Sequence, residues 1–141
     1  MASSQRVHVT HTFTSDPVTV FDKLSEHENL GPVFGAKISR VNDGDTSRNG
    51  VGSTRRLKIG PLPGFEETTT VSEPHTRIEY NITKGSPLKG HWGKQVLAPT
   101  ADGGTKLDYT IGFEAPVPGM AALVGKILTG AIKKGLPKLC P

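Results

Sequence analysis

The most constraining feature of this chain is a change in the spacing of its apolar residues. Between residues 6 and 114, apolar and polar residues alternate in several short segments separated by turns, whereas beyond residue 118 the apolar residues recur every three or four positions. Alternation is typical of strands with one buried face, and the longer period is typical of a helix with one buried face. The chain therefore predicts an antiparallel sheet followed by a helix that covers it.

Length and composition favour one β-rich domain. With 141 residues, the chain is long enough for one hydrophobic core and too short for two, so we expect a single domain over residues 1–141. Glycine and proline together make up 28 of the 141 residues, which favours many turns over a helical bundle. We expect about seven strands, the last of them after a hairpin turn that contains Gly103 and Gly104.

Two short helices are predicted directly after the first strand. Asp16 can cap the first helix, and Pro17 suits its first position. Ser25 and Glu28 have the spacing of a capping box for the second helix, and Gly31, which a proline follows, is expected to end it. In the final segment, the apolar stripe is expected to consist of Met120, Leu123, Val124, Ile127, Ala131 and Ile132.

Extending the alternation to every strand predicts which side chains face the interior. These inward faces combine an apolar wall with a few polar groups, as ligand pockets do. The phase of the strand around residue 95 is ambiguous, and we choose the phase that places Leu97 in the core. The candidate ligand-binding residues are His11, Phe13, Arg55, Leu57, Glu67, Tyr80, His91, Gln95, Tyr109 and Phe113 from the strands, with Leu123 and Ile127 from the final helix.

Arg55 is unusual among the inward positions because it carries a charge. An unpaired guanidinium removed from water costs several kcal/mol, so an inward Arg55 requires a partner, a ligand anion or a wet cavity. Glu67 is the obvious candidate partner, since it has the same assumed orientation on the next strand. Alternatively, a bulge between Gly52 and Arg55 shifts the phase and leaves Arg55 in solvent.

Four segments carry a resemblance to a known family: DPVTVFDKL at 16–24, GVGSTRR at 50–56, EETTTVSEPHTRIEYNI at 66–82 and APTADGGTKLDYTIGFE at 98–114. Together with the final helix, they resemble the helix-grip fold of the START and pollen-allergen superfamily, in particular its polyketide cyclase/dehydrase-like branch. The resemblance covers nearly the whole chain. It implies an α+β fold in which a curved antiparallel sheet and the long C-terminal helix enclose a cavity.

The resemblance implies a ligand more than a reaction. Members of this family typically hold lipids, sterols or polyketides in the cavity, and a minority catalyse cyclisation or dehydration there. They share no catalytic residue set that could be transferred to this chain. His11 and His91 have the chemistry of a general acid or base, but a strand histidine is more often packed and hydrogen-bonded than catalytic, so no catalytic residue is assigned.

Motifs for metals, cofactors and nucleotides are missing from the sequence. The five histidines form no HExxH pair, no CxxC pair is present, and the NDGDTSRNG segment at 42–50 lacks the acidic residue that would end a calcium loop. The GVG at 50–52 lacks the third glycine of a dinucleotide fingerprint and precedes a strand. We therefore expect neither a metal nor a cofactor.

Charge and cysteine content set the expected partners and compartment. The net charge of +4 comes from scattered lysines and arginines, which favours a solvated surface over nucleic-acid binding. A single cysteine, Cys140, excludes an intramolecular disulfide, and the sequence shows no apolar stretch that suits a signal peptide or a membrane span. We expect a cytoplasmic monomer or homodimer without stable membrane insertion.

Three functional hypotheses follow. In the first, the protein binds or transports a small hydrophobic or amphipathic molecule, such as a lipid or polyketide, between the sheet and the C-terminal helix. In the second, it is an enzyme of the cyclase or dehydratase kind that uses a pocket histidine or Glu67 to move protons. In the third, it is an interaction module without a ligand, and side chains fill the interior completely.

Overall fold

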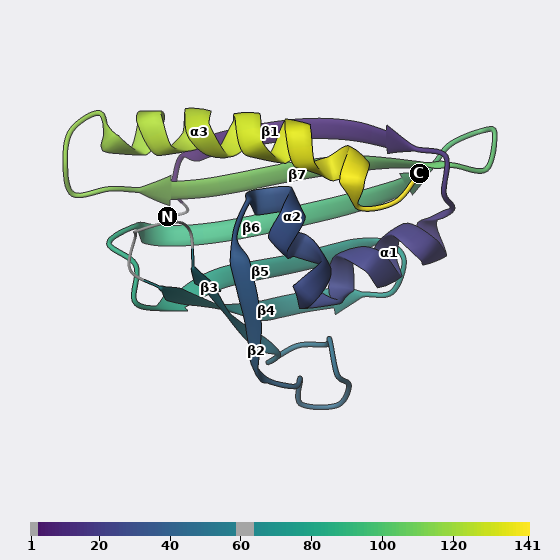
Figure 1. Cartoon of the computed structure of the whole chain (residues 1–141), viewed down its shortest axis with the longest axis horizontal. Coiled ribbons are helices and arrows are strands. Elements are labelled where there is room, and N and C mark those ends of the chain that lie inside the picture. The colour runs from purple at the N-terminus through teal and green to yellow at the C-terminus, as the bar shows by residue number, and fades with distance from the viewer. Residues whose placement is uncertain (1–2, 59–63) are drawn as a thin grey trace.

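The fold is a seven-stranded antiparallel sheet with its helices on one face, seen in the computed structural model, which describes residues 3–58 and 64–141 (Figure 1). The strand order across the sheet is β1-β7-β6-β5-β4-β3-β2. The strands are β1 (Gln5–Phe13), β2 (Lys37–Asn42), β3 (Thr54–Lys58), β4 (Phe65–Glu73), β5 (Arg77–Lys84), β6 (Lys89–Pro99) and β7 (Thr105–Glu114). The helices are α1 (Pro17–Ser25), α2 (Gly31–Phe34) and α3 (Met120–Gly135), with 3-10 turns at His27–Leu30 and Leu136–Lys138.

This arrangement confirms the predicted α+β architecture. Figure 1 shows α3 running along β1 and β7, while α1 and α2 lie in front of the other half of the same sheet face. The hydrophobic core lies between this face and the helices, and Val20 of α1, Ile111 of β7 and Ile132 of α3 are each no more than 2 % exposed. No helix in the described parts of the chain is long and apolar enough to span a bilayer.

The predicted strand phases are confirmed where the structure describes them. Val7, Val9 and Phe13 of β1 are buried, and so are the alternate apolar residues of β7. The phase chosen for β6 is also correct, because Gln95 and Leu97 are 1 % and 5 % exposed. The same alternation predicts that Ile59, two residues after Leu57, also faces inward, but Ile59 lies outside the described residues.

The first helix begins as predicted, but the second is different. The Asp16 carboxylate accepts a hydrogen bond from the Thr19 backbone N–H at 2.8 Å, and Pro17 occupies the first turn of α1. The capping box expected at Ser25 is wrong, since Ser25 is the last residue of α1 and its buried hydroxyl has no hydrogen-bond partner among the described residues. The chain also continues past Gly31 into α2, because a proline is tolerated in the first turn of a helix.

The predicted orientation of the C-terminal helix is wrong by about one position. Leu123 and Ile127 are 59 % and 62 % exposed, so neither lines the interior. The face of α3 that packs on the protein contains instead Ala121, Val124, Gly125, Leu128, Ile132 and Gly135. The helix approaches β1 so closely at Gly125 that an added Cβ would lie 2.8 Å from the Arg6 carbonyl oxygen. A prediction based on large apolar residues does not detect this contact between α3 and β1, because it is made at a glycine.

Two glycines of α3 provide a test of this packing. Gly125→Ala should lower the free energy of unfolding by about 1 kcal/mol or more, because the clash with the β1 backbone outweighs the gain in helix propensity. Gly130→Ala should raise it by up to about 1 kcal/mol, because nothing lies within 4 Å of the added methyl group. Urea denaturation measures both values. Two changes of the same sign would contradict the described orientation of α3.

Candidate functional site

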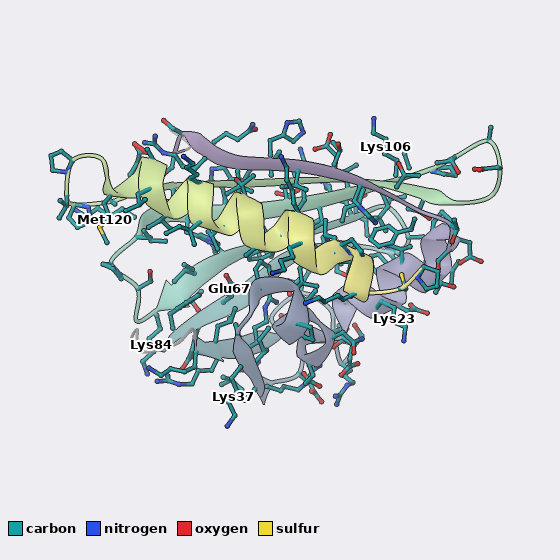
Figure 2. All side chains as sticks on the ribbon, turned by 45° about the horizontal axis from the view of Figure 1, so that its top comes forward. Lys23, Lys37, Glu67, Lys84, Lys106 and Met120 are labelled. Atoms are coloured by element: carbon teal, nitrogen blue, oxygen red, sulfur yellow. The ribbon has the colours of Figure 1, made fainter. Side chains whose placement is uncertain are left out.

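Polar side chains gather on the helix-covered face of the sheet, in the midst of the core. They come from five strands, β3 to β7, and Figure 2 shows one of them, Glu67, on the face that α2 and α3 cover. Each of them was predicted to face inward. We call this group the polar cluster: Arg55, Glu67, Tyr80, His91, Gln95 and Tyr109.

The centre of the polar cluster is a buried ion pair. Arg55 and Glu67 are directly opposite each other on β3 and β4, and their side chains are only 4 % and 6 % exposed. The guanidinium donates a hydrogen bond from Nε to Oε1 of Glu67 at 3.1 Å, and its Nη2 forms an ion-pair contact with the same oxygen at 2.9 Å. The guanidinium also lies 4.7 Å from the centre of the Tyr80 ring. The predicted pairing is therefore confirmed, and the alternative that places Arg55 in solvent is wrong.

Burial and the ion pair have opposite effects on the pKa of Glu67. Burial raises the pKa of the Glu67 carboxyl because the charged form loses its hydration, whereas the positive charge and hydrogen bonds of Arg55 act in the opposite direction. Because Nε and Nη2 of Arg55 both contact Oε1, they hold the Glu67 carboxylate in a fixed orientation. Glu67 is therefore a buried carboxylate with one oxygen committed to Arg55 and a higher proton affinity than an exposed glutamate.

Tyr80 and Tyr109 are hydrogen-bonded to each other through their hydroxyl groups, which joins β5 to β7 across β6. The Tyr80 ring crosses β6 directly over Gly93, where any Cβ would collide with the ring. Burial raises the pKa of both phenols, so they are protonated at neutral pH. The two tyrosines are therefore uncharged neighbours of the ion pair.

His91 has a defined tautomer. Its Nδ1 accepts a hydrogen bond from the Ile82 backbone N–H at 3.1 Å, so the proton of the neutral ring is on Nε2. Nε2 lies 3.9 Å from Oε2 of Glu67, which is too far for a direct hydrogen bond. Burial, with the nearby charge of Arg55, lowers the pKa of His91 to about 4. At neutral pH, His91 thus presents an uncharged N–H donor towards Glu67.

A cavity of about 40 Å³ lies between these two groups and the helices. It is smaller than the ~300–1,000 Å³ of typical ligand pockets, although it exceeds the space of a single water molecule. The interior is therefore neither the roomy enclosure expected for a lipid carrier nor the solid core of an interaction module. The cavity is lined by Phe34, Leu57, Phe65, Glu67, Tyr80, Ile82, Leu88, His91, Ile111 and Leu128.

A second, smaller cavity of about 10 Å³ is bordered by Arg55 and Gln95. The Ser25 hydroxyl and the Gln95 side-chain nitrogen also border it, and neither has a hydrogen-bond partner among the described residues. Its volume is about that of one water molecule. In the described parts of the chain, no three His, Cys, Asp or Glu side chains lie close enough together to hold a metal ion.

The structure divides the twelve predicted site residues into four groups. Leu57, Glu67, Tyr80 and His91 line the larger cavity. Arg55 and Gln95 border the smaller one. The other four strand residues belong to the core or its edge without lining either cavity: His11, Phe13, Tyr109 and Phe113. Leu123 and Ile127 point into solvent.

Six residues that line the larger cavity were not among the predicted candidates. Phe65, Ile82 and Ile111 belong to the predicted inward faces, so the alternation could have identified them. Leu128 was missed because of the incorrect helix orientation. Phe34 and Leu88 lie in or beside short irregular segments, where no periodic pattern indicates which way a side chain points.

Comparisons with known proteins agree with the fold. The family model described as polyketide cyclase / dehydrase and lipid transport matches residues 4–140. A START superfamily protein from Mycobacterium smegmatis has a TM-score of 0.74 at 17% identity, with 94% of this chain and 92% of that chain covered. A protein from Thermus thermophilus has the same TM-score at 20% identity, with 94% of each chain covered.

A third structural neighbour is an enzyme. The norcoclaurine synthase point mutant from Thalictrum, solved in complex with a transition state analogue, has a TM-score of 0.69 at 13% identity, with 99% of this chain and 96% of that chain covered. No functionally curated protein matches the chain in sequence. At these identities, the solved structures establish the fold alone.

The buried ion pair predicts a strong coupling between its two residues. Removing one partner leaves an uncompensated charge, so Arg55→Met or Glu67→Leu alone should each lower the free energy of unfolding by about 3–5 kcal/mol. The double variant should be more stable than either single variant, because it removes both charges. Denaturant titration of the four proteins measures the coupling. Additive losses would contradict the described contact.

His91 should make stability depend on pH. Because its pKa is lowered from 6.5 to about 4, the unfolded chain binds a proton here at a higher pH than the folded protein does. The free energy of unfolding should fall as pH decreases from 6.5 towards 4, with about 3 kcal/mol from this residue. Denaturation curves of the wild type and His91→Phe across this range measure the effect. His11 and Glu67 are present in both proteins, so they do not account for a difference between them. Equal slopes of unfolding free energy against pH would contradict the lowered pKa of His91.

Proposed function

The chain belongs to the polyketide cyclase / dehydrase and lipid transport family, and we propose that it binds a small, uncharged and mostly apolar molecule in the larger cavity. One observation carries the proposal: the walls of this cavity are apolar, apart from Tyr80 and the facing pair of Glu67 and His91 at one end. Apolar walls provide affinity, and a few polar groups at one end orient the ligand.

Charge compensation inside the polar cluster argues for an uncharged ligand. A ligand anion is one of the three partners that an inward Arg55 could have, but Glu67 already neutralises the charge of Arg55. A ligand carboxylate would have to leave water and approach the Glu67 carboxylate, and both changes are unfavourable. The Nε2–H of His91 can instead donate to a carbonyl, ether or hydroxyl oxygen.

The volume of the cavity argues for a small ligand or for local movement. Phe34, Leu88 and Leu128 border the cavity and are only partly buried, so they have space to move outwards. Leu128 belongs to α3, and its displacement would enlarge the cavity without breaking the sheet. The protein would in this way admit a short alkyl chain or a single ring.

Its one cysteine is a free thiol, which fits a reducing cytoplasm as its compartment.

Two six-carbon compounds test the proposal. Hexan-2-one should bind at least about tenfold more tightly than hexanoate, because the carboxylate is repelled by Glu67 and loses more hydration. Saturation-transfer difference NMR and ligand titration measure the two affinities. Mass spectrometry of compounds released when the purified protein is denatured should likewise yield an uncharged molecule. Tighter binding of hexanoate would contradict the proposal.

A matched pair of helix variants locates the binding site. Leu128→Trp places a large ring at the cavity and should abolish binding of hexan-2-one. Leu123→Trp makes the same change on the exposed face of the same helix and should leave binding unchanged. Equal binding by both variants would place the ligand outside this cavity.

A further inference from the structure

We propose that Glu67 and His91 form a proton-transfer site that enolises a small ketone, with Glu67 as the base and His91 as the hydrogen-bond donor to the carbonyl oxygen. This inference rests on the proposed function, because it requires an uncharged carbonyl compound in the larger cavity. It adds a reaction and assigns one role to each side chain.

The base is the second oxygen of Glu67. Both contacts from Arg55 end on Oε1, and the shortest contact between the carboxylate and His91 is made by Oε2. Arg55 therefore orients the carboxylate and favours its charged form without occupying Oε2. Glu67 also lines the larger cavity, so a bound ligand can reach it. Burial increases its proton affinity, which makes it a stronger base than an exposed glutamate.

The donor is fixed from two sides. The backbone N–H of Ile82 holds Nδ1 of His91, and the ring lies against the rings of Tyr80 and Phe113, with centroid distances of 5.7 Å and 6.4 Å. The low pKa keeps the imidazole neutral, and its Nε2–H can stabilise an enolate by donating a hydrogen bond to the enolate oxygen. A pre-oriented donor of this kind requires no reorganisation during the reaction.

The separation of the two groups suits one chemical unit. Nε2 of His91 and Oε2 of Glu67 are 3.9 Å apart. In a C–C=O unit, the α-carbon and the carbonyl oxygen are about 2.4 Å apart, from ordinary bond lengths and angles. A carbonyl oxygen at about 2.9 Å from Nε2 can therefore bring its α-carbon to within about 3–3.5 Å of Oε2, the distance at which proton transfer begins.

The reaction needs no further reactant. Glu67 takes the α-proton, the C–H electron pair forms a C=C bond, and the carbonyl π electrons move to the oxygen, which accepts a hydrogen bond from His91. Return of the proton from Glu67 to carbon regenerates the ketone and the carboxylate. When the Glu67 proton exchanges with D₂O before it returns, the α-position acquires deuterium.

Cyclohexanone in D₂O is the probe, because its α-hydrogens exchange slowly in neutral water without a catalyst. NMR should show loss of the α-hydrogen signal with the wild-type protein, and Glu67→Gln should reduce this rate at least about 100-fold. Glu66→Gln is the matched control, since Glu66 precedes Glu67 on β4 and does not line the cavity. Its rate should equal that of the wild type.

A second variant tests the donor and keeps the inference falsifiable if Glu67→Gln does not fold. His91→Phe retains an aromatic ring between Tyr80 and Phe113 but has no donor, so the exchange rate should fall at least about tenfold. Saturation-transfer difference NMR measures cyclohexanone binding in the same samples. Binding without protein-catalysed exchange in the wild type, or exchange at the wild-type rate in folded variants, would overturn the enolisation and leave the binding function intact. Absence of cyclohexanone binding would overturn the enolisation, and absence of hexan-2-one binding as well would overturn the binding function.

Discussion

The interior of this protein depends on neutralising one buried charge. Arg55 lies on the sheet face that the helices cover, and without a partner its guanidinium would destabilise the fold by several kcal/mol. Glu67 neutralises it from the neighbouring strand. The contact with Arg55 in turn fixes which carboxylate oxygen faces His91, and the guanidinium lies against the Tyr80 ring. Burial, together with the charge of Arg55, favours the neutral form of the His91 imidazole. A stability requirement therefore produces an ordered polar surface beside an apolar cavity.

The same packing explains why the cavity is small. Tyr80 crosses β6 over Gly93 to reach Tyr109, and these two rings fill space that smaller side chains would leave open. Leu88, from the connection between β5 and β6, and Leu128, from α3, border the cavity, and both are partly exposed. Enlargement of the cavity thus requires movement of flexible side chains on one side only, while the polar cluster on the sheet remains in place.

The sequence predicted the sheet well because strand alternation is a local property. Each inward phase that the structure describes was correct, including those of Arg55 and Gln95, and the pairing of Arg55 with Glu67 followed from the need to neutralise a buried charge. The buried face of α3 was predicted incorrectly because it depends on a close approach between the helix and the β1 backbone at Gly125. A count of large apolar residues does not detect such an approach. The tautomer of His91 could not be predicted from the sequence, since it depends on a hydrogen bond from the Ile82 backbone N–H of another strand.

The central claim is that an uncharged ligand occupies the larger cavity with its oxygen on His91. A crystal structure of the protein soaked with hexan-2-one tests this most directly. The account predicts that the ketone oxygen lies within hydrogen-bond distance of Nε2 and that the alkyl chain contacts Leu88 and Leu128, with the contact between Arg55 and Glu67 unchanged. A ketone bound elsewhere on the protein, or an oxygen bonded to Arg55 in place of Glu67, would contradict it.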